Sequence, residues 1–374
     1  MIYLDNCATT RVFDEALEVC NIYMKEKYFN PSGLYRLSKK TEEDIDSARK
    51  AIADVIHANP GEIYFAPSAT MANNMLLLSI LSKNDKKNIV TTYTEHSSVF
   101  KTIKSFKEKR EIRYVKVFED GSLDLDDLKN KVDENTGLVS IMQVQNEIGV
   151  INNLEEIGKI VRDKSNAIFH VDGVQGFIKY PLNVKKIGID LYTISAHKVH
   201  GPKGIAGLFV DSKLKLQEIF HGGGQERGYF PGTENVAGIM GFKKAVEIYT
   251  ENRDEVVDRV KAFKKKLISE LEKIEGSRIN SYGGSDFIVS VSFKDIRSEV
   301  LIHYLENYDI CVSSGSSCSK NNRSRVLEAI KLSDDFIDGT IRISFSYFTN
   351  EEEINEFLVK LKEGVETLRS MVRR

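Results

Sequence analysis

The sequence of 374 residues contains only four cysteines, and they are scattered along the chain. Cys7, Cys20, Cys311 and Cys318 form neither a paired disulfide framework nor the C-x-x-C spacing of a zinc site. The seven histidines show no zinc pattern either. We therefore expect reduced thiols, no bound metal and a cytoplasmic location, where an exposed cysteine can be kept for chemistry.

The sequence also lacks a long apolar run and an excess of charge of either sign. Its densest apolar run, MLLLSIL at 75–81, is far shorter than a membrane span. The first residues, MIYLDNCATT, contain no basic segment followed by an apolar one, so we expect no signal peptide. Lys and Arg total 53 against 55 for Asp and Glu, and this balance gives no reason to expect direct binding to nucleic acid or to a membrane.

Short apolar runs alternate with helical patterns through the first two-thirds of the chain. Buried strands separated by helices predict an α/β domain with a mainly parallel, seven-stranded sheet, which we place at residues 14–252. Ligands of such sheets bind beyond the carboxyl ends of the strands. The predicted strands are Ile63–Phe65, Asn88–Thr91, Ile112–Val117, Gly137–Met142, Ala167–Val171, Ile189–Ile194 and Ile205–Val210.

The last third of the chain has a different pattern. A long charged helical stretch at Val236–Ile274 leads to apolar runs at Phe287–Phe293 and Ile341–Phe345, without a further series of alternating strands and helices. The length of the chain also favours two domains. We predict a smaller α+β domain made of residues 1–13 and 253–374.

Lys198 and Asp172 follow two consecutive predicted strands, in SAHKVHGPKG (195–204) and FHVDGVQG (169–176). A partly desolvated lysine at a strand end can lose its proton and form a Schiff base. Pyridoxal phosphate (PLP) needs such a lysine, and it needs a carboxylate that keeps its pyridine nitrogen protonated. The alternatives are a solvated surface lysine and an aspartate that only caps a turn.

Polar residues at the same strand ends suit a phosphate group. Ala69 and Thr70 follow Ser68 where a strand turns into a helix, and free backbone N–H groups at such a turn bind anions. Ser195 and His197 add two donors just before Lys198.

His96, in TEHSSV, also follows a predicted strand. A neutral imidazole there could stack on a planar ring and carry protons near neutral pH. The alternative is a residue that only starts a helix.

Cys318 lies in SSGSSCSKNNRSR (313–325), which contains no aliphatic or aromatic side chain. Cysteines that serve packing lie among apolar neighbours, so this one is predicted to be exposed. Nearby Lys320, Arg323 and Arg325 favour its thiolate, which is the nucleophilic form.

These segments together resemble the cysteine desulfurases of the NifS/IscS type, which have the class V aminotransferase fold. The resemblance extends over nearly the whole chain and implies the PLP-dependent transferase (aspartate aminotransferase-like) fold. The matching segments are YLDNCATT (3–10), NPSG (30–33), PSATMANN (67–74), TEHSSV (94–99), QNEIGV (145–150), HVDGVQG, SAHKVHGPKG, HGGGQERG (221–228), PGTEN (231–235), SSGSSC and IRISF (341–345).

The resemblance implies a role for each matching residue. Lys198 would hold PLP, Asp172 would pair with its pyridine nitrogen, and His96 would stack on its ring. Asn146 and Gln175 would hydrogen-bond the phenolic oxygen of PLP. The phosphate would be bound by Ala69, Thr70, Ser195 and His197, and by Thr233 from a neighbouring subunit.

The resemblance also implies a substrate and partners. Arg342 would bind the carboxylate of L-cysteine, and Cys318 would take its sulfur as a persulfide and leave L-alanine. Thr233 implies a homodimer, and the persulfide implies a sulfur-acceptor protein, either an iron–sulfur scaffold or a tRNA-thiolation enzyme. Some positions differ from the usual family pattern, among them Pro67, Met71, Gln225 and Pro231.

Two other interpretations remain open. Another class V PLP enzyme, such as an aminotransferase, a selenocysteine lyase or a β-elimination lyase, would use Lys198, Asp172 and His96 in the same way. A non-catalytic sulfur-trafficking subunit would keep the fold as a docking surface, but it would have no need of Lys198 and Cys318.

Overall fold

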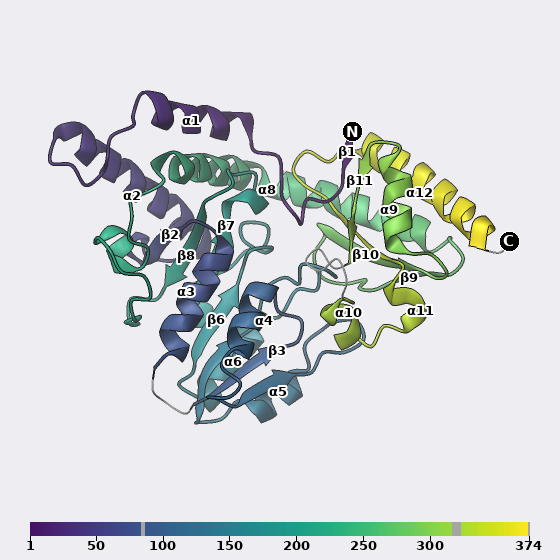
Figure 1. Ribbon diagram of the computed structural model, residues 1–374, viewed down its shortest axis with the longest axis horizontal. Helices are drawn as coiled ribbons and strands as arrows, with labels where there is room; N and C mark the ends of the chain where they lie inside the picture. Colours follow the sequence, from purple (N-terminus) through teal and green to yellow (C-terminus); the bar gives the residue numbers. More distant parts are fainter. Residues whose placement is uncertain (84–86, 316–322, 373–374) are drawn as a thin grey trace.

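The computed structural model describes residues 1–83, 87–315 and 323–372, which form a larger and a smaller part (Figure 1). The larger part is built on a seven-stranded sheet with the order β2-β8-β7-β6-β5-β3-β4. Strand β8 runs opposite to the other six strands, which all run in one direction. This arrangement confirms the predicted α/β fold with a mainly parallel sheet. The strands are β2 (Ile63–Ala66), β3 (Asn88–Thr92), β4 (Ile112–Val115), β5 (Thr136–Ser140), β6 (Ile168–Asp172), β7 (Leu191–Ser195) and β8 (Ala206–Val210).

Helices cover both faces of this sheet (Figure 1). Successive strand residues point to opposite faces, so Leu138 and Val139 of β5 belong to two separate apolar clusters. One face is covered by α3 (Ala69–Leu81) and α4 (Ser97–Lys104). In the larger part, the helices that contribute to the other cluster include α2 (Arg36–Ile56), α5 (Leu125–Lys131), α6 (Leu154–Lys164), α7 (Val184–Ile187) and α8 (Val236–Leu271), with α1 (Asp14–Lys25) packed on α8.

Short polar side chains start the helices that follow the strands. The Oγ of Ser68 accepts a hydrogen bond of 3.2 Å from the backbone N–H of Met71 at the start of α3. Asn235 does the same for Gly238 in α8, at 3.0 Å. Such caps satisfy backbone N–H groups that have no partner inside the helix, and they fix where the chain turns from a strand end into a helix.

The smaller part contains a four-stranded antiparallel sheet, β12-β13-β10-β9. The N-terminal strand β1 (Ile2–Tyr3) pairs in parallel with β11 (Ile310–Cys311), so the first residues pack with this part. The predicted domain boundary after residue 252 falls inside the continuous helix α8. The remaining elements are β9 (Ser277–Ile279), β10 (Ile288–Phe293), β12 (Ser313–Ser314), β13 (Thr340–Ser344), α9 (Ser298–Glu306), α10 (Arg325–Ala329), α11 (Asp334–Ile337) and α12 (Glu351–Val372).

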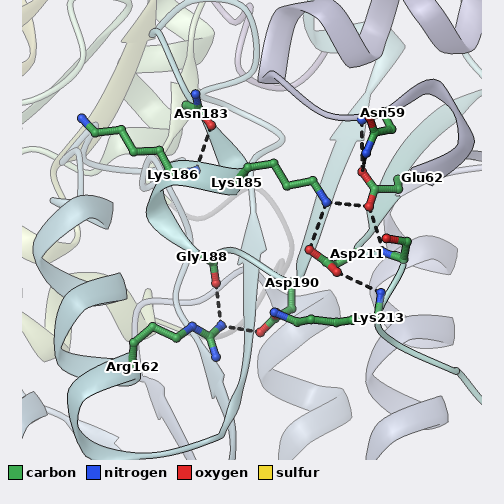
Figure 2. A network of polar contacts seen from close by, with 11 residues as sticks. Asn59, Glu62, Arg162, Asn183, Lys185, Lys186, Gly188, Asp190, Asp211 and Lys213 are labelled. Carbon is green, nitrogen blue, oxygen red and sulfur yellow. Dashed lines mark hydrogen bonds and ion pairs between the residues drawn. The ribbon is translucent and has the colours of Figure 1, made fainter.

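A network of charged residues joins the strands at the amino-terminal edge of β6 and β7 (Figure 2). The buried Asp190 precedes β7, and its Oδ2 accepts hydrogen bonds from the Phe169 N–H at 2.7 Å and from Arg162 at 2.5 Å. Glu62, next to β2, accepts from Lys185 at 2.5 Å and from the Ser212 N–H at 2.9 Å. These bonds tie neighbouring strands together at this edge, while the polar residues that follow β6 and β7 occupy the other edge.

We expect Glu62→Gln to lower the free energy of unfolding, because Glu62 is stabilised as a carboxylate. Burial alone would raise the pKa of Glu62, but the hydrogen bonds from Lys185, Ser212 and Asn59 outweigh burial and lower it to about 2. The loss should be roughly 1–3 kcal/mol near pH 7, as for other hydrogen bonds to charged groups.

Acid should reduce the difference in the free energy of unfolding between the wild type and Glu62→Gln. Because the pKa of Glu62 is lower in the folded than in the unfolded protein, its contribution is complete above about pH 4.3 and is lost toward about pH 2. Denaturant unfolding of both proteins at several pH values measures the effect. A difference that stays constant between neutral and acidic pH would contradict this account.

Candidate active site

A cavity of about 320 Å³ lies at the carboxyl ends of β6 and β7. This volume is within the range of about 300–1,000 Å³ that is typical of small-molecule sites. Arg342 of the small sheet and Cys7 and Ala8 of the N-terminal segment also line it, so both parts of the chain contribute. The predicted site residues that line this cavity are Ala69, Thr70, His96, Asn146, Asp172, Gln175, Ser195, His197, Lys198 and Arg342.

Lys198 lies in a short 3-10 helix, Ala196–Lys198, directly after β7. Its Nζ donates hydrogen bonds to the backbone oxygens of Cys7 and Ala8. Burial lowers the pKa of Lys198 to about 8, and the nearby Arg342 adds to this effect. The amine of Lys198 therefore loses its proton at a lower pH than an ordinary lysine does, and the neutral amine is the nucleophilic form.

Asp172 ends β6, the strand next to β7, and it is buried. Its Oδ1 accepts a hydrogen bond from the Val174 N–H at 3.1 Å, and its Oδ2 accepts one from Asn73 Nδ2 at 2.9 Å. The structure thus confirms that Asp172 and Lys198 open onto one edge of the sheet. Asn73 was not identified from the sequence, although a polar residue in the apolar helix MANNMLLLSIL could have signalled it.

His96 is the N-cap of α4 and also lines the cavity. Its Nδ1 accepts a hydrogen bond from the Ser98 N–H at 3.2 Å and lies 2.8 Å from Ser98 Oγ. Burial lowers the pKa of His96. The charge of Asp172 opposes this effect, and the charges of Lys198 and Arg325 add to it. The imidazole is therefore neutral at pH 7. His96 starts a helix and also faces the cavity, while its stacking on a planar ring and its part in proton transfer remain predictions.

The N-terminus of α3 and the start of the Lys198 segment meet at the same cavity. Ala69 and Thr70 form the first turn of α3, where backbone N–H groups have no partner inside the helix. Ser195 and His197 approach from the end of β7. Burial lowers the pKa of His197 to about 4, so this side chain is a neutral hydrogen-bonding group.

Arg342 lies on β13 and is almost fully buried. Its Nη1 donates to the backbone oxygen of Asn146 at 2.9 Å, and its Nη2 donates to Asp5 Oδ1 at 2.7 Å. A guanidinium held in this way at a cavity wall suits a carboxylate ligand. The sequence did not identify Asp5, because its partner is more than three hundred residues away in the chain.

Asn146 and Gln175 also line the cavity. Gln175 Nε2 donates a hydrogen bond of 3.0 Å to the backbone oxygen of Cys7, and its Oε1 is buried without a hydrogen-bond partner in the described part of the chain. The contacts of both residues with a phenolic oxygen remain predictions.

Among the described residues, the predicted site residue Thr233 is not part of this cavity. Thr233 lines a second cavity, of about 640 Å³, together with Met71, Phe230 and Glu234. Its predicted role in a neighbouring subunit remains a prediction. Cys318 lies outside the described residues.

The described residues on either side of the 316–322 segment are tied to the site. Ser313 lies opposite Arg342 in the small sheet. On the other side, Arg325 donates hydrogen bonds of 2.6 Å to the backbone oxygens of Tyr93 and Glu95, next to His96. Its guanidinium stacks on Phe100 at 3.6 Å from the ring centroid.

Two other classes of site are not found in the part of the chain that the structure describes. Within residues 1–83, 87–315 and 323–372, no group of three or more His, Cys, Asp or Glu side chains could hold a metal ion. None of the described helices is long and apolar enough to cross a membrane.

Residues 2–357 match the family model of the class V aminotransferases. The chain belongs to the class V aminotransferase family. The chain is 35% identical to the cysteine desulfurase IscS of Dictyoglomus turgidum over 382 residues, which cover 99% of the chain and 96% of the relative.

Solved structures give the same relationship. A NifS-like protein superposes with a TM-score of 0.91 at 36% identity, covering 98% of this chain and 99% of the other chain. A structure described as SspA in complex with cysteine superposes with a TM-score of 0.81 at 29% identity, covering 92% of this chain and 99% of the other. These similarities show that the chain shares the fold of both structures.

Proposed function

We propose that this protein is a PLP-dependent cysteine desulfurase of the class V aminotransferase family. It converts L-cysteine to L-alanine and transfers the sulfur to Cys318 as a persulfide. Relatives that match 99% of its length carry the name cysteine desulfurase. The observation that carries the proposal is that Lys198, Asp172 and Arg342, three groups that the reaction requires, line one cavity.

The described residues fit PLP. Lys198 offers an amine with a lowered pKa, and each oxygen of Asp172 accepts one hydrogen bond and keeps a lone pair for a pyridinium N–H. The first turn of α3 offers backbone N–H groups to a phosphate. When bound, PLP supplies an electron sink for the negative charge that develops on the substrate carbon.

The side chains of this protein then divide the work. Arg342 binds the substrate carboxylate, and neutral His96 carries a proton at the cavity wall. The thiolate of Cys318 forms a bond with the substrate sulfur while the carbon–sulfur bond breaks and leaves its electron pair on carbon. Protonation of that carbon gives L-alanine, so one cysteine and one enzyme thiol yield one alanine and one persulfide.

The same proposal includes partners and location. Thr233 lies outside the candidate active-site cavity of its own chain. A homodimer in which Thr233 reaches the phosphate of the neighbouring subunit accounts for this position. A sulfur-acceptor protein, either an iron–sulfur scaffold or a tRNA-thiolation enzyme, takes the persulfide sulfur in the cytoplasm. The reduced cysteines and the absence of a paired framework in the sequence support that location.

The amine of Lys198 should control how fast PLP attaches to the apoprotein. Because burial lowers its pKa to about 8, the rate should rise with pH through a midpoint near that value, well below the value of about 10.4 for a free lysine. The appearance of the visible absorption band after PLP is mixed with apoprotein measures this rate. A rate that does not change across this pH range, or that rises only in strong base, would show that Lys198 is not desolvated.

Product analysis tests the function. The purified holoenzyme, given L-cysteine and a reductant, should form alanine and sulfide in equal amounts. A β-elimination lyase would release pyruvate and ammonia with the sulfide, and an aminotransferase would release a keto acid without sulfide. Either of these results would replace the proposal, and the absence of any product would favour a non-catalytic role.

A further inference from the structure

Two buried side chains, Asn73 and Ser98, connect the buried Asp172 to the half-buried His96 in one chain of hydrogen bonds. Asn73 Nδ2 lies 2.9 Å from Asp172 Oδ2 and 2.9 Å from Ser98 Oγ. Ser98 Oγ in turn lies 2.8 Å from His96 Nδ1. Asn73 and Ser98 were not among the residues identified from the sequence, and the proposed function assigns them no part.

The charge of Asp172 fixes the orientation of the Asn73 amide. An ionised carboxylate only accepts hydrogen bonds, so the Asn73 atom that faces it must be the nitrogen. In this orientation the Oδ1 of Asn73 is buried and has no hydrogen-bond partner among the residues that the structure describes. Because such a buried acceptor costs free energy, the contact with Asp172 must outweigh the cost.

The orientation of Asn73 in turn fixes the hydroxyl of Ser98. Asn73 Nδ2 uses one hydrogen for Asp172 and the other for Ser98 Oγ. The oxygen of Ser98 is thus an acceptor toward Asn73, and its own hydrogen is free to point at His96 Nδ1. The backbone N–H of Ser98 also donates to Nδ1, at 3.2 Å. A ring nitrogen that accepts from two donors carries no hydrogen, which leaves the hydrogen of the neutral imidazole on Nε2.

We propose that Asn73 and Ser98 are positioning residues that hold His96 in the Nε2–H tautomer and make this tautomer depend on the charge of Asp172. His96 lines the cavity, so the nitrogen that is away from Ser98 is available there as a hydrogen donor. During turnover, neutral His96 therefore donates a hydrogen bond from Nε2 and cannot accept a proton at this nitrogen. This consequence for turnover rests on the proposed function, whereas the tautomer itself does not.

Nitrogen NMR of protein labelled in its histidines tests the proposal, because the two tautomers give different nitrogen shifts and long-range couplings. His96→Gln identifies the signals of His96. We expect the Nε2–H pattern in the wild-type holoenzyme. In Asn73→Asp the new carboxyl oxygen has at most one hydrogen, so it cannot donate to both neighbours and must accept from Ser98. The hydroxyl then turns away from His96, and the Nδ1–H form should increase.

Asn74→Asp is the matched control. It adds the same charge one residue further along α3, where the Asn74 side chain contacts Thr70 O and Thr102 and not the chain of bonds to His96. Its His96 signals should match those of the wild type.

Asp172→Asn gives a second test if Asn73→Asp does not fold. The new amide nitrogen at position 172 would face Asn73, so the Asn73 amide should flip and offer Oδ1 to this nitrogen and to Ser98. The Ser98 hydroxyl should then turn away from His96, and the Nδ1–H form of His96 should increase, as in Asn73→Asp. The proposal is overturned if wild-type His96 carries its hydrogen on Nδ1, or if neither variant changes the tautomer. Because the NMR needs no turnover, alanine formation tests the proposed function separately: either result can hold while the other fails.

Discussion

Replacement of Lys198 by alanine is expected to abolish both covalent attachment of PLP and alanine formation. The amine of Lys198 lies in the cavity beside Asp172 and Arg342, and its lowered pKa of about 8 makes it nucleophilic near neutral pH. The variant loses covalent attachment of PLP together with the amine as a proton-transfer group. A proton-transfer group by itself typically contributes about 10²–10⁴-fold to the reaction rate. We expect the rate of alanine formation to fall by more than about a thousandfold.

Borohydride reduction followed by peptide mapping measures the attachment directly. In the wild type the reduced adduct should lie on the peptide that contains Lys198, and in the variant no such adduct should form. Lys203→Ala is a matched control, because Lys203 is an exposed lysine in the same segment. An adduct that maps to a different lysine would show that the site is assigned wrongly.

Replacement of Cys318 by serine should stop sulfur release while leaving PLP binding intact. A hydroxyl is a far weaker nucleophile than a thiolate at neutral pH, so the bond between the substrate carbon and sulfur should not break at a measurable rate. A hundredfold loss corresponds to about 2.7 kcal/mol of additional barrier, and we expect at least that. Lys198, Asp172 and Arg342 are untouched, so the visible spectrum of the bound cofactor and the binding of cysteine should stay close to those of the wild type.

Cys20→Ser and Cys311→Ser are the controls for this variant. Both cysteines are described by the structure, and neither lines the cavity. Sulfide and alanine formation by these two proteins should match the wild type. Release of sulfide by Cys318→Ser at a rate near that of the wild type would favour a simple lyase.

The sequence predicted the fold and most of the cavity because the strands of the large sheet have clear signals. Asp172 and Lys198 follow buried apolar runs, and parallel strands bring such ends to one edge. The short strands β1, β11 and β12 were not predicted, because each has two residues, which are too few for a periodic pattern.

The residues that orient the site could not be predicted in the same way. Asp5 meets Arg342, and Asn73 meets Asp172, only because the chain folds to bring distant segments together. Ser98 was missed for another reason, since a serine near a helix start is usually a cap. Here the Ser98 hydroxyl links the side chains of Asn73 and His96 instead. Only the positions of these groups in the folded chain reveal this link.

The most direct test of the central claim is a mass measurement on the holoenzyme after brief exposure to L-cysteine without a reductant. The account predicts one additional sulfur atom on the peptide that contains Cys318, together with about one alanine per active site. Alanine without added sulfur on that peptide, or added sulfur on Cys20 or Cys311 instead, would contradict it.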